Sequence, residues 1–269
     1  MTTLRDNLWL WGQSPGSHHT PSHYHLPGVN RMTPAEGCAF FGTSNCCRVA
    51  MSAGPFPPFD EESRQLTHLK KVIWSILGAG GIASHNAGGF GDLEEVIRQA
   101  KQFPNIIGGV LDDFFSETRR KVYPPENIAE VRRRLIQGAG RPMELWVVWY
   151  EREIQVDISK YLPSFDAVTF WTWYGQNLAE LPANLDRMIA TTPEKRRYAG
   201  CYLWDYGNAK PLSDDMMLYQ LETYRKYIRS GKLNGIILCS NCCADLGLST
   251  VELTQKWLQA HADEEIPQR

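Results

Sequence analysis

The 269-residue sequence contains no long hydrophobic run and no block of like charge. No apolar stretch approaches the roughly 20 residues of a membrane-spanning helix, so we expect no membrane partner. The net charge is −2 and the basic residues form no stripe, which argues against binding of nucleic acid. The N-terminal segment MTTLRDNLWLWGQ lacks a basic stretch followed by an apolar one. We therefore expect no signal peptide and a cytoplasmic protein.

Disulfide bonds are also not expected. The seven cysteines are an odd number, and no export signal accompanies them, so free thiols are the default. Three lie in CSNCC, residues 239–243, and two are Cys46 and Cys47, all beside apolar runs typical of strands. Because a free cysteine packs like a small hydrophobic residue, buried or site-lining thiols are favoured over a metal or redox site.

A strong dinucleotide-binding fingerprint is missing as well. The glycine-rich stretch LGAGGIASHNAGGFG, residues 77–91, follows an apolar run but does not match GxGxxG. It is also too long for a tight turn between a strand and a helix. A loop over an active site is the favoured interpretation, and a phosphate-binding turn is the less favoured one.

What the sequence does contain is a series of apolar runs separated by segments with helical periodicity. Most runs are continuously apolar, which is typical of strands buried on both faces of a parallel sheet. Repeated strand–helix units in a chain of this length predict a single-domain (β/α)₈ TIM barrel over residues 1–269, with an open doubly wound sheet as the alternative. The predicted strands are residues 8–12, 46–51, 71–77, 106–113, 143–150, 165–173, 198–206 and 233–240. The predicted helices are residues 33–42, 60–68, 91–103, 124–138, 177–190, 213–231 and 249–261.

Helix boundaries are marked by capping residues. Thr33, followed by Pro34 and Glu36, predicts a capping box, and Ser213 predicts a second N-cap. Ser249, with Glu252 three residues later, predicts another capping box, and Gly138 is expected to end its helix.

The loop after the first predicted strand, residues 13–32, is long and rich in histidine. Long loops of this kind in a compact barrel are usually functional. Its histidines are His18, His19, His23 and His25. They lack the fixed helical spacing of a strong metal motif, so we favour histidines that bind a polar ligand or are solvated, and we expect no resident metal or cofactor.

Aromatic and polar side chains gather where the predicted strands end, which is where the active site of a TIM barrel lies. Three of them are aspartates: Asp112 and Asp113 after the fourth strand and Asp205 after the seventh. Flat aromatic faces stack on the C–H groups of a sugar ring, and polar groups bind its hydroxyls. The expected carbohydrate-binding residues are Trp11, Gln13, His18, His19, Trp74, Tyr150, Glu151, Trp171, Trp173, Trp204, Tyr206 and Asn241.

Carboxylates in an aromatic pocket suit glycoside hydrolysis, in which one donates a proton and the other attacks or activates water. Apolar walls and a neighbouring like charge would raise the pKa of one of them. Structural roles are the alternative. One of the Asp112–Asp113 pair would cap a turn or pair with an arginine, Asp205 would form a turn, and Glu151 would pair with Arg152.

The motifs GGVLDDFF, residues 108–115, and CYLWDYG, residues 201–207, resemble the TIM-barrel glycoside hydrolases. One large clan of these enzymes carries its acid/base after strand four and its nucleophile after strand seven. The resemblance implies Asp112 or Asp113 as the acid/base and Asp205 as the nucleophile. This chain departs from the clan, which normally has Glu at both places, the first preceded by Asn.

Two other functions remain open from the sequence. One is a metal-dependent TIM-barrel sugar isomerase or hydrolase, with first-loop histidines, Asp112, Asp113 and Glu151 as ligands. The other is a non-catalytic carbohydrate-binding barrel. In each case the expected partner is a small-molecule carbohydrate. The sequence determines neither the sugar nor the oligomeric state.

Overall fold

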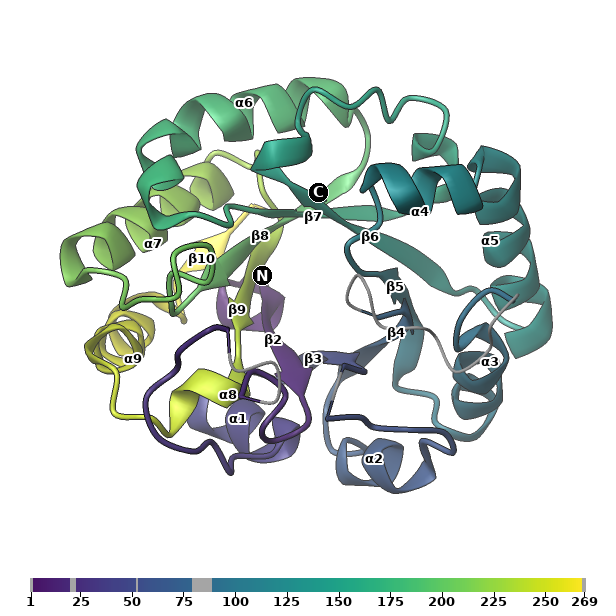
Figure 1. The fold of residues 1–269 in the computed structure, drawn as a ribbon, viewed down its shortest axis with the longest axis horizontal. Helices are drawn as coiled ribbons and strands as arrows, with labels where there is room; N and C mark the ends of the chain where they lie inside the picture. Colours follow the sequence, from purple (N-terminus) through teal and green to yellow (C-terminus); the bar gives the residue numbers. More distant parts are fainter. Residues whose placement is uncertain (1, 20–22, 52, 79–88, 268–269) are drawn as a thin grey trace.

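The computed structural model describes residues 2–19, 23–51, 53–78 and 89–267. Eight parallel strands form a closed barrel in sequence order (Figure 1). Because β2 (Leu8–Gln13) pairs with β9 (Gly235–Cys239), the ring is closed, and the predicted TIM barrel is confirmed over the open sheet. The other barrel strands are β3 (Asn45–Val49), β4 (Lys71–Leu77), β5 (Ile106–Leu111), β6 (Glu144–Tyr150), β7 (Ala167–Trp171) and β8 (Arg196–Tyr202).

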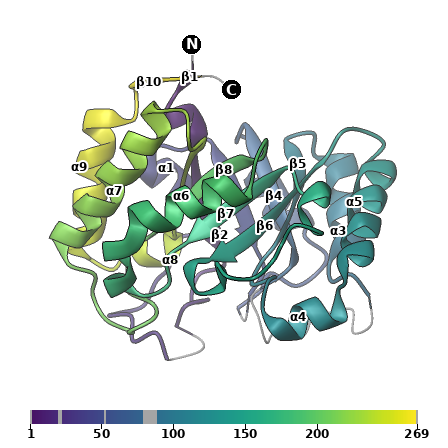
Figure 2. The same cartoon turned by 90° about the horizontal axis from the view of Figure 1, so that it is seen from above.

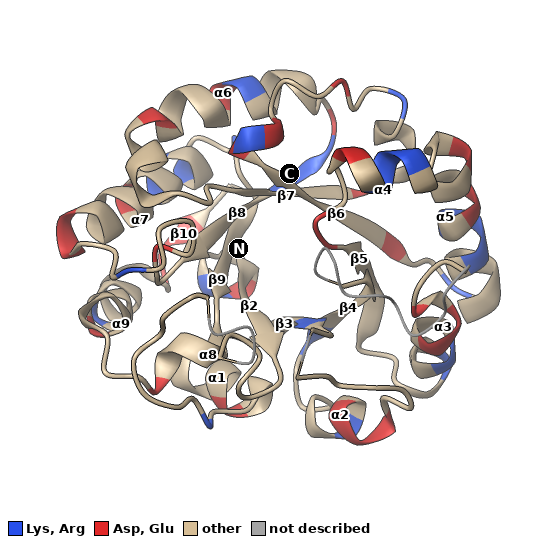
Figure 3. Cartoon of the chain, in the orientation of Figure 1, with Lys and Arg blue, Asp and Glu red and all other residues tan. Residues whose placement is uncertain are grey.

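Helices surround the barrel (Figure 1) and bear positive and negative side chains in mixed order (Figure 3). Each predicted helix is present, although the one expected from residue 177 begins with the 3₁₀ segment Gly175–Glu180. No helix of the described residues is long and apolar enough to cross a membrane. The helices are α1 (Pro34–Phe41), α2 (Asp60–Gln65), α3 (Leu93–Gln102), α4 (Glu117–Val122), α5 (Pro125–Ala139), α6 (Leu181–Thr191), α7 (Asp214–Arg229), α8 (Asn241–Ala244) and α9 (Ser249–His261).

The predicted caps are only partly right. The capping box of Thr33 and Glu36 and the N-cap at Ser213 are confirmed. The capping box at Ser249 is wrong, because the Ser249 hydroxyl donates to Asp214 of α7 instead. Gly138 also does not end α5. A Cβ atom there would lie 2.8 Å from Ile97, so this glycine lets α5 pack against α3.

A short antiparallel pair that the sequence did not predict lies outside the barrel. β1 (Thr2–Thr3) pairs with β10 (Glu265–Ile266) and brings the two ends of the chain together. Figure 2 shows this pair at one end of the molecule and α4 at the other. Because α4 follows β5, the carboxyl-terminal ends of the barrel strands lie at the end away from the termini.

Aromatic side chains fill much of the barrel interior. The ring centroids of Trp9 and Trp146 are 4.8 Å apart, and Trp146 stacks on Tyr198 with ring centroids 4.6 Å apart. These residues alternate with outward-facing neighbours, as strands require. All seven cysteines are free and buried, as expected from the sequence.

Close packing inside the barrel makes Gly200 a test of the fold. A Cβ atom at Gly200 of β8 would lie 1.9 Å from the ring of Trp171 on the neighbouring strand. We expect Gly200→Ala to lower the free energy of unfolding by about 1–3 kcal/mol in urea denaturation, because Trp171 must move. Gly140→Ala is the control: φ there is 70° but no atom lies within 4 Å, so the loss should be about 1 kcal/mol or less. A smaller loss at Gly200 than at Gly140 would contradict this packing.

Candidate active site

A cavity of about 160 Å³ lies at the carboxyl-terminal ends of the barrel strands. It is smaller than the roughly 300–1,000 Å³ of sites for drug-sized ligands, so it suits a single small ring. Sequence-predicted residues form most of its wall: Trp11, Gln13, His18, Asp112, Asp113, Tyr150, Trp171, Trp173 and Tyr206.

Both carboxylates at the end of β5 line this cavity. Asp112 is buried, and its Oδ1 accepts a 2.9 Å hydrogen bond from the backbone N–H of Asp113. Consecutive residues of a strand normally point to opposite sides. Asp113 instead has a left-handed φ of 48°, which turns the chain so that both carboxylates line one cavity.

The two carboxylates differ in their surroundings. Burial, together with the negative charge of Asp113, raises the pKa of Asp112 well above its ordinary value. The charge of Arg119 partly opposes this rise, but Arg119 donates its hydrogen bond to the carbonyl of Gly78, and Arg120 donates to that of Phe115. The pair therefore combines a buried carboxyl group whose surroundings favour the neutral form with a more exposed one.

Aromatic rings form the opposite wall of the cavity. The ring of Trp11 packs edge to face against that of Trp171, with ring centroids 5.1 Å apart. The ring centroids of Trp171 and Tyr202 are 5.0 Å apart. Trp173 stacks on Tyr206 at 5.9 Å with an interplanar angle of 25°. Flat surfaces of this kind fit the C–H faces of a sugar.

Buried polar groups lie among these rings. The Tyr206 hydroxyl is 2.6 Å from Nδ1 of His18 and 3.0 Å from Sγ of Cys243. Burial lowers the pKa of His18 to about 3 and raises the pKa of Tyr206. At neutral pH both groups are therefore uncharged and act as hydrogen-bonding groups.

Asp205, the nucleophile implied by the resemblance, does not line the cavity. It is buried, and its Oδ1 accepts hydrogen bonds from the N–H groups of Gly175 (3.0 Å) and Asn208 (3.2 Å). Its Oδ2 accepts a third, of 2.9 Å, from the Asn208 amide. Its carboxylate instead holds the turns at residues 174–176 and 205–210.

Glu151 and Trp74 also lie off the cavity wall. Glu151 accepts hydrogen bonds from the backbone N–H of Trp173 (3.0 Å) and from the side-chain amide of Asn177 (3.0 Å), so it orients the loop after β7. Trp74 stacks on Phe59 at 4.4 Å and lies under the guanidinium group of Arg48. The alternation along β4 directs its ring toward the helices instead of the barrel interior.

Three further predicted residues do not line the cavity: Trp204 and Asn241 contact the first loop, and His19 belongs to it. Trp204 donates from Nε1 to the carbonyl of Tyr24 at 2.9 Å and so holds that part of the loop. Asn241 donates to the carbonyls of Gln13 (2.8 Å) and Met32 (2.7 Å), which joins the two ends of the loop. The two ring nitrogens of His19 are buried and have no hydrogen-bond partner within the described chain.

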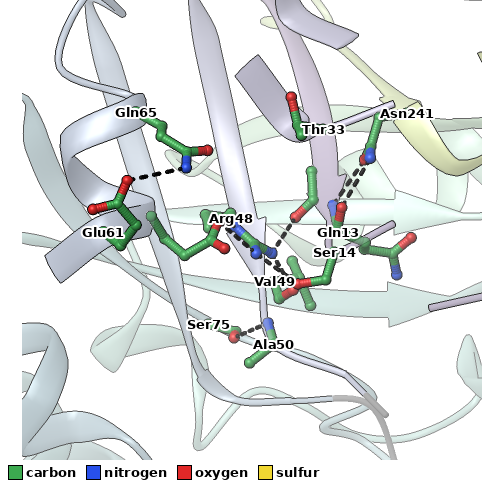
Figure 4. Close-up of polar contacts among 12 residues, drawn as sticks. Gln13, Ser14, Thr33, Arg48, Val49, Ala50, Glu61, Gln65, Ser75 and Asn241 are labelled. Carbon is green, nitrogen blue, oxygen red and sulfur yellow. Dashed lines mark hydrogen bonds and ion pairs between the residues drawn. The ribbon is translucent and has the colours of Figure 1, made fainter. Parts of the chain in front are cut away.

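The close-up in Figure 4 shows how the start of this loop is fixed. Asn241 forms a reciprocal pair with the backbone of Gln13, because its Oδ1 also accepts from Gln13 N–H at 2.8 Å. Arg48, fully buried, donates to Ser14 (2.8 Å) and to the carbonyl of Val49 (2.9 Å), and pairs with Glu62 of α2. These bonds tie β2, β3 and α8 together behind the cavity.

Five residues that the sequence analysis did not select complete the wall: Tyr24, Met51, Arg152, Tyr202 and Cys239. Strand alternation was a signal for one of them, because Tyr202 follows the inward-facing Gly200 at a spacing of two in β8. Arg152 lies in a 3₁₀ segment beyond the end of β6. Tyr24 and Met51 lie in loops, where no periodicity applies.

Metal-ligating side chains do not converge in the part of the chain that the structure describes. No group of three or more His, Cys, Asp or Glu residues there could hold a metal ion. The glycine-rich stretch expected to cover the active site lies mostly outside the described residues, since residues 79–88 are not described.

Comparisons with known proteins support the architecture. No family model matches the sequence, and no curated protein matches it. One similar solved structure is a glycoside hydrolase family 18 N-acetylglucosaminidase from Paenibacillus barengoltzii, with 10% identity over 93% of this chain and 99% of that chain and a TM-score of 0.53. Another is a family 99 endo-α-mannosidase from Bacteroides thetaiotaomicron, with 12% identity over 82% of this chain and 76% of that chain and a TM-score of 0.50.

The same fold occurs with other chemistry. The structure of a tryptophan synthase complex from Pyrococcus furiosus also matches, with 8% identity, 98% of each chain and a TM-score of 0.51. At these identities the likeness establishes the fold, and the fold-level resemblance to TIM-barrel glycoside hydrolases is confirmed.

The raised pKa of Asp112 predicts how stability depends on pH. The pKa of this carboxyl is higher in the fold than in the unfolded chain. At pH values between the two, the folded protein keeps a proton that the unfolded chain releases. The free energy of unfolding therefore falls as pH rises through that interval. Asp112→Asn removes this loss and keeps an acceptor for Asp113 N–H, so the variant should be more stable than wild type at pH 7.

Urea denaturation at pH 4 and pH 7 measures the effect. The difference between the variant and wild type should shrink toward pH 4, where both carry a neutral side chain. Glu117→Gln, an exposed position on α4, serves as the control and should change little at either pH. A stability difference that is equal at both pH values would contradict a raised pKa of Asp112 in the fold.

Proposed function

We propose that the protein is a glycoside hydrolase that acts on a small glycoside. The observation that carries the proposal is the pair Asp112 and Asp113 in one aromatic cavity, with the pKa of Asp112 raised by burial. A carboxyl group that is protonated near neutral pH can donate a proton to the leaving oxygen of a glycosidic bond.

In this proposal the two carboxyl groups have separate roles. Asp112 gives its proton to the departing oxygen. Asp113, which is more exposed, accepts a proton from the attacking group or stabilises positive charge on the sugar ring. The cavity wall supports these roles because Trp11, Trp171 and Trp173 offer flat faces to the ring.

The nucleophile is not assigned to a third carboxylate. Apart from Asp112 and Asp113, no carboxylate among the described residues lines the cavity. Tyr150 and Tyr202 are also unsuited, because burial raises their pKa and keeps the phenols protonated. We assign the attack to water or to a group of the substrate, as in substrate-assisted glycosidases.

Gln13 provides a place for a sugar hydroxyl. Its Nε2 is directed toward Met51, and its Oε1 is buried without a hydrogen-bond partner in the described part of the chain. Because a buried acceptor without a partner is costly, a ligand O–H that reaches Oε1 would gain affinity.

Nitrophenyl glycosides of neutral hexoses, N-acetylhexosamines and uronic acids, in both anomeric forms, test the proposal. We expect wild type to hydrolyse at least one of them, and Asp112→Asn and Asp113→Asn to reduce kcat about 100-fold or more. Because Asn keeps the shape of Asp, sugar binding, followed by tryptophan fluorescence, should survive in both variants.

The control for this experiment is again Glu117→Gln, which should retain wild-type kcat because the residue is exposed. Unchanged turnover in both Asp variants would contradict the assigned chemistry. Sugar binding without turnover in wild type would instead favour a non-catalytic carbohydrate-binding barrel.

A further inference from the structure

Arg152 gives the cavity a positive charge that hydrolysis of a neutral sugar does not require. It follows β6 in the 3₁₀ segment Glu151–Glu153 and is the sole arginine or lysine among the described residues that line the cavity. His18, the other basic residue there, is neutral because burial lowers its pKa to about 3. Arg152 is exposed whereas Tyr150 beneath it is buried, so the guanidinium group lies at the cavity mouth.

The guanidinium group is held by rings. Its central carbon lies 4.4 Å from the ring centroid of Tyr150 and 5.3 Å from that of Trp173. Aromatic contacts of this kind hold the cation in place without using its N–H groups. The donors at its edge therefore stay available to a ligand.

No protein carboxylate within the described ranges forms an ion pair with Arg152. Its neighbour Glu151 is occupied by Trp173 N–H and the Asn177 amide. Glu153 lies on the same 3₁₀ segment, and burial raises its pKa although the charge of Arg152 opposes this, but the two side chains form no ion pair within the described ranges. By contrast, Arg196 pairs with Glu144 at 2.8 Å and Arg225 with Glu264 at 2.6 Å.

We propose that the cavity takes a glycoside bearing a carboxylate, such as a uronic acid, and that Arg152 binds this carboxylate. The planar guanidinium group presents parallel N–H donors that match the two oxygens of a carboxylate. The inference rests on the proposed carbohydrate-binding function and adds the class of substrate.

The different exposure of the two groups supports this assignment. Arg152 is exposed at the cavity, whereas Asp113 is half-buried, so an approaching anion reaches the guanidinium group first. A bound carboxylate would approach Arg152 at the mouth and leave Asp113 for the reacting end of the sugar. Binding would also bury the exposed face of Arg152, which strengthens the ion pair by removing water.

Matched pairs of ligands test the proposal: D-glucuronate and D-galacturonate against their neutral methyl esters, titrated into the full-length protein. Trp11, Trp171 and Trp173 in the cavity wall make tryptophan fluorescence a direct readout of binding. We expect wild type to bind at least one acid about tenfold or more tightly than its ester. Arg152→Gln should abolish this preference, and Arg152→Lys should restore part of it, because lysine keeps the charge but not the paired donors.

Arg187→Gln, an exposed position on α6, is the matched control and should keep the full preference. Ester binding should be unchanged in Arg152→Gln, which shows that the cavity is intact. Equal binding of acid and ester by wild type, or a preference that survives in Arg152→Gln, overturns the proposal. Stronger binding of glucose 6-sulfate than of either uronate also overturns the assignment to a carboxylate.

Turnover separates this inference from the proposed function. Arg152-dependent binding of the acids without hydrolysis of their nitrophenyl glycosides supports the inference and contradicts the hydrolase. Hydrolysis of neutral glycosides, with no preference for acids in binding, supports the hydrolase and contradicts the inference about Arg152. Absence of binding by every sugar overturns both.

Discussion

Closure of the eight-stranded ring is the constraint on which the site depends. Because all the strands run parallel, their carboxyl-terminal ends meet at one rim, and residues as distant in sequence as Trp11 and Cys239 line one cavity. Closure depends in turn on dense packing inside the barrel, where Gly200 of β8 leaves room for the ring of Trp171. The shape of the cavity is therefore set by the same contacts that hold the barrel together.

Burying charged groups at this rim costs desolvation free energy, and the structure limits this cost in two ways. Asp112 lies in surroundings that favour its neutral form, since desolvation and the charge of Asp113 both raise its pKa. Arg152 keeps its charge at the cavity mouth, where solvent and the rings of Tyr150 and Trp173 stabilise it. The cavity thus combines a buried carboxyl group, a more exposed one beside it and a cation at its mouth.

Residues outside the wall fix the segments that form it. Asn241 joins both ends of the first loop, Trp204 holds the backbone of Tyr24, and Glu151 and Asp205 accept N–H groups of the segment 173–175. These polar side chains make their hydrogen bonds within the protein instead of facing the cavity. Their abundance at strand ends therefore reflects loop structure as much as binding.

The sequence by itself determined the barrel, since continuous apolar runs and capped helices are local patterns that burial enforces, and it located the acidic pair after the fourth barrel strand. It did not determine which side chains at the strand ends reach the cavity. That choice depends on strand alternation, which turns Trp74 away, and on hydrogen bonds from the loops, which hold Asp205. It also depends on the left-handed backbone at Asp113, which directs two consecutive carboxylates to one side. Only tertiary contacts decide these directions, because each requires a neighbouring strand or loop to accept the side chain.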